Sequence, residues 1–205
     1  MAYTMTKEAV ETFARQNKLA MQFLMVATDE YAAARCCLFN GLLSGLVLGA
    51  QAVEKYLKAF ILFRDSTKNV RKLSHKISSL ANQASSLDSS FSSSQYAQLI
   101  TKLEQHYNTR YPDNLDASKH MSSSEIDELD QFVIFINEKM GVPLEVKYRS
   151  GFYAQINSSL ERSVLFPTER WIKENNKALI PLLPSIQSQY LAVRNHLYPN
   201  ISNSP

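Results

Sequence analysis

Glu54, Lys55 and Lys58 form a charged group on one predicted helix, and lysine suits contact with a phosphate. Glu54 and Lys58 are four residues apart, which places them on one face of a helix as a favourable ion pair. His75 follows after a short connection, and the imidazole is a side chain that can serve as an acid, a base or a phosphate contact. Lys55 adds a further cation for a phosphate oxygen. These residues predict a charged groove that binds an anion.

A second group of candidate residues surrounds Pro112. A residue before a proline is pushed out of helical conformations, so we expect a helix to end here and to hold Arg110 in a fixed position. The guanidinium fork of Arg110 suits a phosphate or a carboxylate. Tyr111 and Asp113 flank the proline and complete this group.

Each of these residues also has a structural interpretation. Glu54 and Lys58 fit the solvated face of an otherwise buried helix, and His75 fits a cap or loop anchor near the start of the next helix. Arg110 fits an ion pair with Glu54 or Asp113, with the neighbouring tyrosines packed in the core. The sequence alone leaves both interpretations open.

The glycine and cysteine content excludes several classes of enzyme. Only 5 of the 205 residues are glycine, and no stretch forms a Gly-x-Gly-x-x-Gly turn or a Walker phosphate loop, which excludes Rossmann and P-loop enzymes. The two cysteines, Cys36 and Cys37, are adjacent, so they build no disulfide framework, and we expect them to be core residues. No histidine or cysteine set has metal-ligand spacing, and no G-x-S-x-G elbow is present. We therefore expect neither a metal nor a cofactor.

The lack of a disulfide framework and of a secretory signal favours a protein of the reducing cytoplasm. The net charge of +3 does not by itself require a nucleic-acid partner, and the first residues lack the apolar stretch of a secretory signal. Residues 36–53 are uncharged and contain a G-x-x-x-G-x-x-x-G pattern, which is also found in membrane helices. Polar residues interrupt this run, so we prefer a close-packing seam in a bundle, or a dimer face, at Gly41, Gly45 and Gly49. We expect no membrane association.

Apolar residues at helical spacing predict an all-α fold, an up-and-down antiparallel helical bundle with a C-terminal helical appendage. The bundle occupies residues 1–140, in four or five helices capped by Thr6 and by Ser122 or Ser124. Expected breaks are the Asn40-Gly41 pair, a flexible serine-rich loop at residues 85–94, Pro112, and Gly141.

Residues 141–205 form the extension, which we expect to be mostly helical and packed on the bundle. Residues 144–153 fit a short strand or an extended arm. A helix is expected from Pro167 through Leu179, broken by Pro181 and Pro184, and a last helix follows with Tyr190 among its inward residues.

Three segments, in this order, resemble the HEPN (higher-eukaryote and prokaryote nucleotide-binding) domain family. They are QAVEKYLKAF at residues 51–60, KLSHKISSL at residues 72–80 and HYNTRYPD at residues 106–113. The family shows an A-x-E-K-x-L-K helix, then an H-x-(I/L)-x-x-L helix and then Y-x-x-x-R-Y-P-D. The resemblance covers about residues 17–140.

The resemblance implies a helical bundle, often dimeric, with a polar groove that binds a nucleotide, RNA or a protein partner. It implies nucleotide-binding roles for Lys55, Lys58, His75, Arg110, Tyr111 and Asp113. Some members are ribonucleases, including toxins paired with a nucleotidyltransferase antitoxin, so a homodimer and a nucleotidyltransferase partner protein are expected alternatives.

The ribonuclease members carry Arg-x(4–6)-His, and this chain does not. None of its histidines has an arginine five to seven residues before it; Arg71 is too close to His75, and Arg110 is too far from His120. We therefore expect a binding module, with a divergent metal-independent ribonuclease of a toxin–antitoxin or defence system as the alternative. His75 and Arg110 are the candidate catalytic residues, and a scaffold that binds neither RNA nor nucleotides is a third interpretation.

Overall fold

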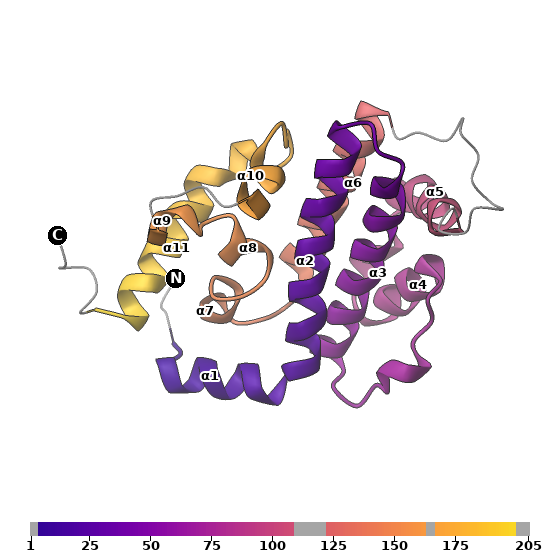
Figure 1. Ribbon diagram of the computed structural model, residues 1–205. Coiled ribbons are helices and arrows are strands. Elements are labelled where there is room, and N and C mark those ends of the chain that lie inside the picture. The colour runs from indigo at the N-terminus through magenta and orange to yellow at the C-terminus, as the bar shows by residue number, and fades with distance from the viewer. Residues whose placement is uncertain (1–3, 109–121, 163–166, 200–205) are drawn as a thin grey trace.

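The computed structural model describes residues 4–108, 122–162 and 167–199, and every regular element in these ranges is a helix (Figure 1). The predicted all-α bundle with a C-terminal helical appendage is confirmed. Within the described residues the bundle has six helices rather than the expected four or five: α1 (Lys7–Gln16), α2 (Lys18–Phe39), α3 (Ser44–Arg64), α4 (Ile77–Leu87), α5 (Ala97–Asn108) and α6 (Ser123–Lys139).

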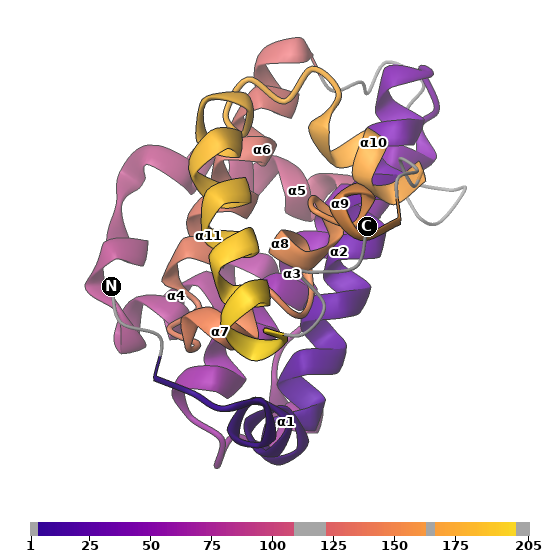
Figure 2. The same cartoon turned by 90° about the vertical axis from the view of Figure 1, so that its left-hand side faces the viewer.

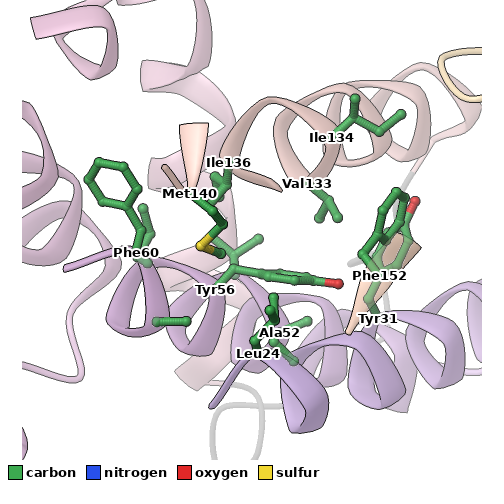
Figure 3. Packing of buried hydrophobic residues seen from close by; sticks show 14 of the residues in the cluster. Leu24, Tyr31, Ala52, Tyr56, Phe60, Val133, Ile134, Ile136, Met140 and Phe152 are labelled. Carbon is green, nitrogen blue, oxygen red and sulfur yellow. The ribbon is translucent and has the colours of Figure 1, made fainter. Parts of the chain in front are cut away.

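Helix α3 is the centre of the bundle. It packs against α2 along their length and also contacts α4, α5 and α6. Figure 1 shows α4 and α5 on one side of the α2–α3 pair, with the extension on the other side. Tyr56 and Phe60 of α3 are fully buried, and Figure 3 shows Tyr56 between Leu24 of α2 and Val133 of α6. The candidate residues Glu54, Lys55 and Lys58 therefore stand on the most enclosed helix of the fold.

Local signals begin and end several helices as expected. The Thr6 hydroxyl caps α1 by accepting a hydrogen bond from the Ala9 amide at 3.2 Å. Ser122, not Ser124, caps α6 in a reciprocal capping box with Glu125. Gly41 follows α2 with a φ of 70°. A side chain adopts this left-handed conformation at a cost, so glycine suits the sharp turn into α3.

Gly45 and Gly49 lie at close contacts between helices of the same chain, Gly45 against α2 and Gly49 against α6, whereas a Cβ added at Gly41 would meet nothing within 4 Å. A Cβ atom added at Gly45 would lie 2.7 Å from Cγ of Leu38 and 2.9 Å from the carbonyl oxygen of Ala34. Gly49 faces Leu129, with an added Cβ 3.3 Å from its Cδ2. The stretch that raised the membrane alternative is thus divided between α2, a turn and α3. In the described part of the chain, no helix has both the length and the apolar character needed to cross a membrane.

Two expectations about the bundle are wrong. The stretch expected to be a flexible loop at residues 85–94 instead contains the end of α4 and parts of two 3-10 turns, Ser89–Ser92 and Ser94–Tyr96. Phe91 anchors the first turn by packing against Phe60, with 4.6 Å between the two ring centroids. Cys36 and Cys37 are half-buried rather than core residues, because they lie in the last turn of α2 beside the exposed end of the helix.

The extension begins with short helices, and the predicted strand or arm at residues 144–153 is wrong. This stretch contains α7 (Leu144–Lys147) and α8 (Phe152–Gln155), separated by a turn in which Gly151 has a φ of 68°. Helix α9 (Ser159–Arg162) follows. The apolar residues that suggested a strand, including Val146, Phe152 and Tyr153, are buried on these short helices.

The last two helices divide at a different point from the one predicted. Helix α10 (Pro167–Lys173) ends well before Leu179, and Asn175 adopts a left-handed φ of 54° in the turn that follows. Pro181 and Pro184 do not break a helix; they begin the 3-10 turn Ile180–Leu182 and helix α11 (Leu183–Leu197). A proline is tolerated in the first turn because its missing N–H has no partner there. Figure 2 shows α11 in front on this side of the molecule.

Candidate functional site

The carboxylate of Glu54 joins two of the predicted site residues. Nζ of Lys58 donates a hydrogen bond to Oε1 of Glu54 at 2.7 Å, so the predicted pair one helical turn apart is present. Each of the two residues is only 4 % exposed, however, so the solvated-face interpretation is wrong. The ammonium group also lies 6.0 Å from the ring centroid of Phe23 on α2. A buried ion pair of this kind is costly to desolvate, and each charge depends on the other.

His75 completes the cluster from outside the helix. Its Nδ1 lies 2.9 Å from the same Oε1 of Glu54, while the side chain remains 74 % exposed. The backbone around it is held by Leu73, which is buried, and by the Ser74 hydroxyl, which accepts a hydrogen bond from the Lys76 amide at 2.9 Å. His75 is therefore a residue of the connection between α3 and α4, anchored to α3 through its side chain.

The contact with Glu54 determines which ring nitrogen of His75 is available to a ligand. An ionised carboxylate only accepts hydrogen bonds, so Nδ1 of His75 must carry the proton that it shares with Glu54. In the neutral ring, Nε2 then has a free lone pair. The exposed edge of His75 can accept a proton or a hydrogen bond, and once protonated it can donate to a phosphate oxygen. A carboxylate that orients an imidazole in this way is a common device for fixing the tautomer.

The six predicted site residues separate into three groups. Lys58 and His75 meet at Glu54. Lys55 does not join this cluster, because its Nζ pairs with Oε2 of Glu30 on α2 at 2.7 Å. Arg110, Tyr111 and Asp113 lie outside the described residues.

Arg35 is not part of this site. It is fully buried and pairs with Asp130 of α6, which is also fully buried. Its Nε donates to the carbonyl oxygen of Trp171 at 2.7 Å, and its Nη2 donates to that of Glu174. Tyr31 adds a 2.6 Å hydrogen bond from its hydroxyl to Asp130. This network connects the bundle to the extension.

The burial of Asp130 could have been inferred from the sequence, although we did not predict it. Asp130 lies four residues after Ile126 and three before Val133, within the apolar stripe of α6. A carboxylate in such a stripe must find a buried partner. Nothing in the sequence indicates that the partner is Arg35.

The cluster can act on an anion through hydrogen bonding and proton transfer. Within residues 4–108, 122–162 and 167–199, no three His, Cys, Asp or Glu side chains are placed to hold a metal ion. The groups present are an oriented imidazole at the surface and an ammonium group that neutralises the carboxylate behind it.

Comparison with known proteins identifies the bundle. A family model for the HEPN domain matches residues 20–138, which run from the first turn of α2 to the last turn of α6 and include the whole Glu54–Lys58–His75 cluster. No curated protein and no solved structure matches the chain.

Proposed function

Because the chain belongs to the HEPN domain family, we propose that it is a binding module that holds a nucleotide, an RNA or a protein partner at the Glu54–Lys58–His75 cluster. One observation carries the proposal: Glu54, buried on α3, holds an exposed imidazole by its Nδ1. An exposed histidine is usually free to rotate, and its fixed orientation here supports a role in contacting a ligand.

The charge arrangement supports a phosphate-bearing ligand. The positive charge of Lys58 offsets the negative charge of Glu54, so an incoming phosphate does not meet an uncompensated carboxylate. His75 offers the ligand contact, and Lys58 acts behind it because it is almost completely buried. Arg110, Tyr111 and Asp113 remain proposed ligand contacts in this scheme, as does Lys55, which lies outside the cluster and pairs with Glu30.

Ligand-dependent thermal stabilisation tests this function. We expect a nucleoside monophosphate or a short single-stranded RNA to raise the melting temperature of the full chain, and His75→Ala to abolish the effect. His196→Ala is the matched control, because His196 is also exposed but lies on α11 in the extension. Equal stabilisation of His75→Ala and wild type would reject the site.

The oriented imidazole also favours the alternative function, a divergent metal-independent ribonuclease. His75 would take the proton of the attacking 2′-hydroxyl through Nε2 and then give it to the 5′-oxygen as the bond between that oxygen and phosphorus breaks. A cation such as Arg110 would stabilise the charge on the phosphorane. The missing Arg-x(4–6)-His motif weighs against this alternative. Degradation of RNA in the presence of a chelator, lost in His75→Ala and in Arg110→Ala, would establish it.

The assembly and cellular setting are further parts of the proposal. We propose a homodimer in the cytoplasm and a nucleotidyltransferase as a candidate partner protein, both by analogy with the family. Sedimentation of the purified chain tests the dimer. Co-purification with a nucleotidyltransferase encoded beside it tests the partner, and a chain that binds neither RNA nor nucleotides would favour a scaffold.

A further inference from the structure

We propose that residues 68–76, called the basic segment here, form a docking surface for the backbone of a single-stranded RNA that passes over His75. The inference rests on the proposed function and names its ligand class. The basic segment joins α3 to α4 and includes the 3-10 turn Val70–Lys72.

The basic segment concentrates the positive charge of the protein. It contains four cations and no acidic residue, namely Lys68, Arg71, Lys72 and Lys76. The whole chain has a net charge of +3, so all remaining residues together sum to −1. The net positive charge of the protein therefore comes from this one exposed connection.

Most of these cations have no carboxylate partner among the described residues. No described carboxylate lies within ion-pair distance of Arg71, Lys72 or Lys76, and all three residues are exposed. Lys68 has only a 3.7 Å contact with Asp65. That carboxylate already accepts hydrogen bonds from the hydroxyl and the amide of Thr67, and these bonds hold its pKa below the usual value. The cations are available to neutralise phosphates from outside.

The backbone of the segment is held in place. The side chain of Asn69 caps the 3-10 turn by accepting a hydrogen bond from the Arg71 amide at 3.0 Å. Leu73 is buried in the core, and the Ser74 hydroxyl binds the Lys76 amide. These anchors lower the entropy that the segment loses when a ligand binds.

The distribution of apolar side chains distinguishes RNA from a membrane. The two apolar residues of the segment turn inward, because Leu73 is buried and Val70 is half-buried. A membrane-docking surface needs an apolar group to enter the lipid, and this surface offers none. A flexible polyanion in water is the ligand that it fits.

His75 provides a contact that is specific for RNA. It lies within the basic segment, and its Nε2 faces away from the Nδ1 that binds Glu54. A lone pair on Nε2 can accept a hydrogen bond from a ribose 2′-hydroxyl, which DNA lacks. In this arrangement the phosphates of the RNA contact the cations of the basic segment, and one of its riboses contacts His75. The strand therefore runs along residues 68–76.

Salt-dependent binding of a labelled single-stranded RNA to the full chain tests the inference. The variant Arg71→Gln/Lys72→Gln removes two exposed cations from the segment. For single strands, each lost phosphate contact reduces the slope of log K against log salt by about 0.7, so a reduction of about 1.4 is expected. Affinity at low salt should fall by about tenfold or more.

A matched control is available in the extension. The variant Arg170→Gln/Lys177→Gln removes one arginine and one lysine whose side chains are also mostly exposed, and it should keep the wild-type slope. Unchanged melting temperatures would show that both variants fold. Single-stranded DNA of the same sequence should bind wild type more weakly than RNA, and His75→Ala should remove that preference.

The outcomes separate the inference from the proposed function. If His75→Ala loses RNA binding while Arg71→Gln/Lys72→Gln matches the control variant, the docking surface is wrong and the proposed site stands. Equal binding of RNA and DNA by wild type would overturn the assignment to RNA. If wild type binds a mononucleotide but no RNA, the inference fails alone, and if it binds neither ligand, both proposals fail.

Discussion

Nδ1 of His75 lies 2.9 Å from Oε1 of Glu54 and thereby joins the connection between α3 and α4 to the buried middle of α3. The same oxygen accepts the hydrogen bond from Lys58. Glu54 is therefore a positioning residue. It orients the imidazole of His75 at the surface, and its negative charge neutralises the buried ammonium group of Lys58.

Glu54→Gln should reduce both ligand binding and stability. The variant leaves Lys58 buried without a counter-charge, and breaking a buried ion pair from one side costs about 3–5 kcal/mol. Lys58→Met should be destabilising for the same reason, whereas Glu54→Gln/Lys58→Met should recover part of the loss. Urea unfolding of the three variants measures the coupling between the two residues. Simple additivity of the two single costs would show that the pair is not an energetic unit.

Asp130→Ala should be the most destabilising carboxylate substitution on α6. Arg35 would lose its counter-charge in a site with no access to water, at a cost of about 3–5 kcal/mol. Asp127→Ala, on the same helix, removes only the partner of the exposed Lys177, and about 0–1 kcal/mol is expected. Thermal and urea unfolding compare the two variants. Similar stability of both would contradict the buried network.

Gly45→Leu should destabilise the α2–α3 contact. The new side chain would meet the backbone and side chain of Leu38 at less than contact distance, and overpacking of this kind costs about 1–3 kcal/mol or more. Gly49→Ala is the milder control, because its Cβ would lie 3.3 Å from Cδ2 at the end of the Leu129 side chain and at an ordinary 3.9 Å from Cβ of Ala34. A wild-type melting temperature for Gly45→Leu would show that the helices are not in close contact there.

The capping box of α6 makes stability depend on pH in the acid range. Burial by itself would raise the pKa of Glu125, but hydrogen bonds from Lys102 and from Ser122 lower it from 4.5 to about 2. The ionised carboxylate therefore contributes stability that is present above about pH 4.5 and is lost as the pH falls towards 2. Wild type should exceed Glu125→Gln in stability at pH 6, and the difference should shrink at low pH. A constant difference across this range would contradict the linkage.

Features that depend on a few neighbouring residues could be predicted from the sequence. The caps at Thr6 and Ser122 and the turn at Gly41 each follow from one side chain or one backbone conformation. The pair of Glu54 and Lys58 follows from helical spacing alone. Its burial could not be predicted, because burial depends on how α2 and the other helices cover α3.

Features that depend on distant partners could not be predicted. The link between His75 and Glu54 spans 21 residues, and that between Arg35 and Asp130 spans 95. The short helices at residues 144–155 escape prediction because a four-residue helix has too few turns to show helical spacing. Their stability comes from packing rather than from a local pattern.

The most direct test of the candidate site is the imidazole nitrogen spectrum of the ¹⁵N-labelled chain, with the His75 signals assigned by His75→Ala. Adding single-stranded RNA should shift the Nε2 signal of His75, because that atom faces the ligand, while the His196 signals on α11 stay unchanged. RNA binding that leaves the His75 signals in place would contradict the proposed site, because the ligand would then occupy another surface.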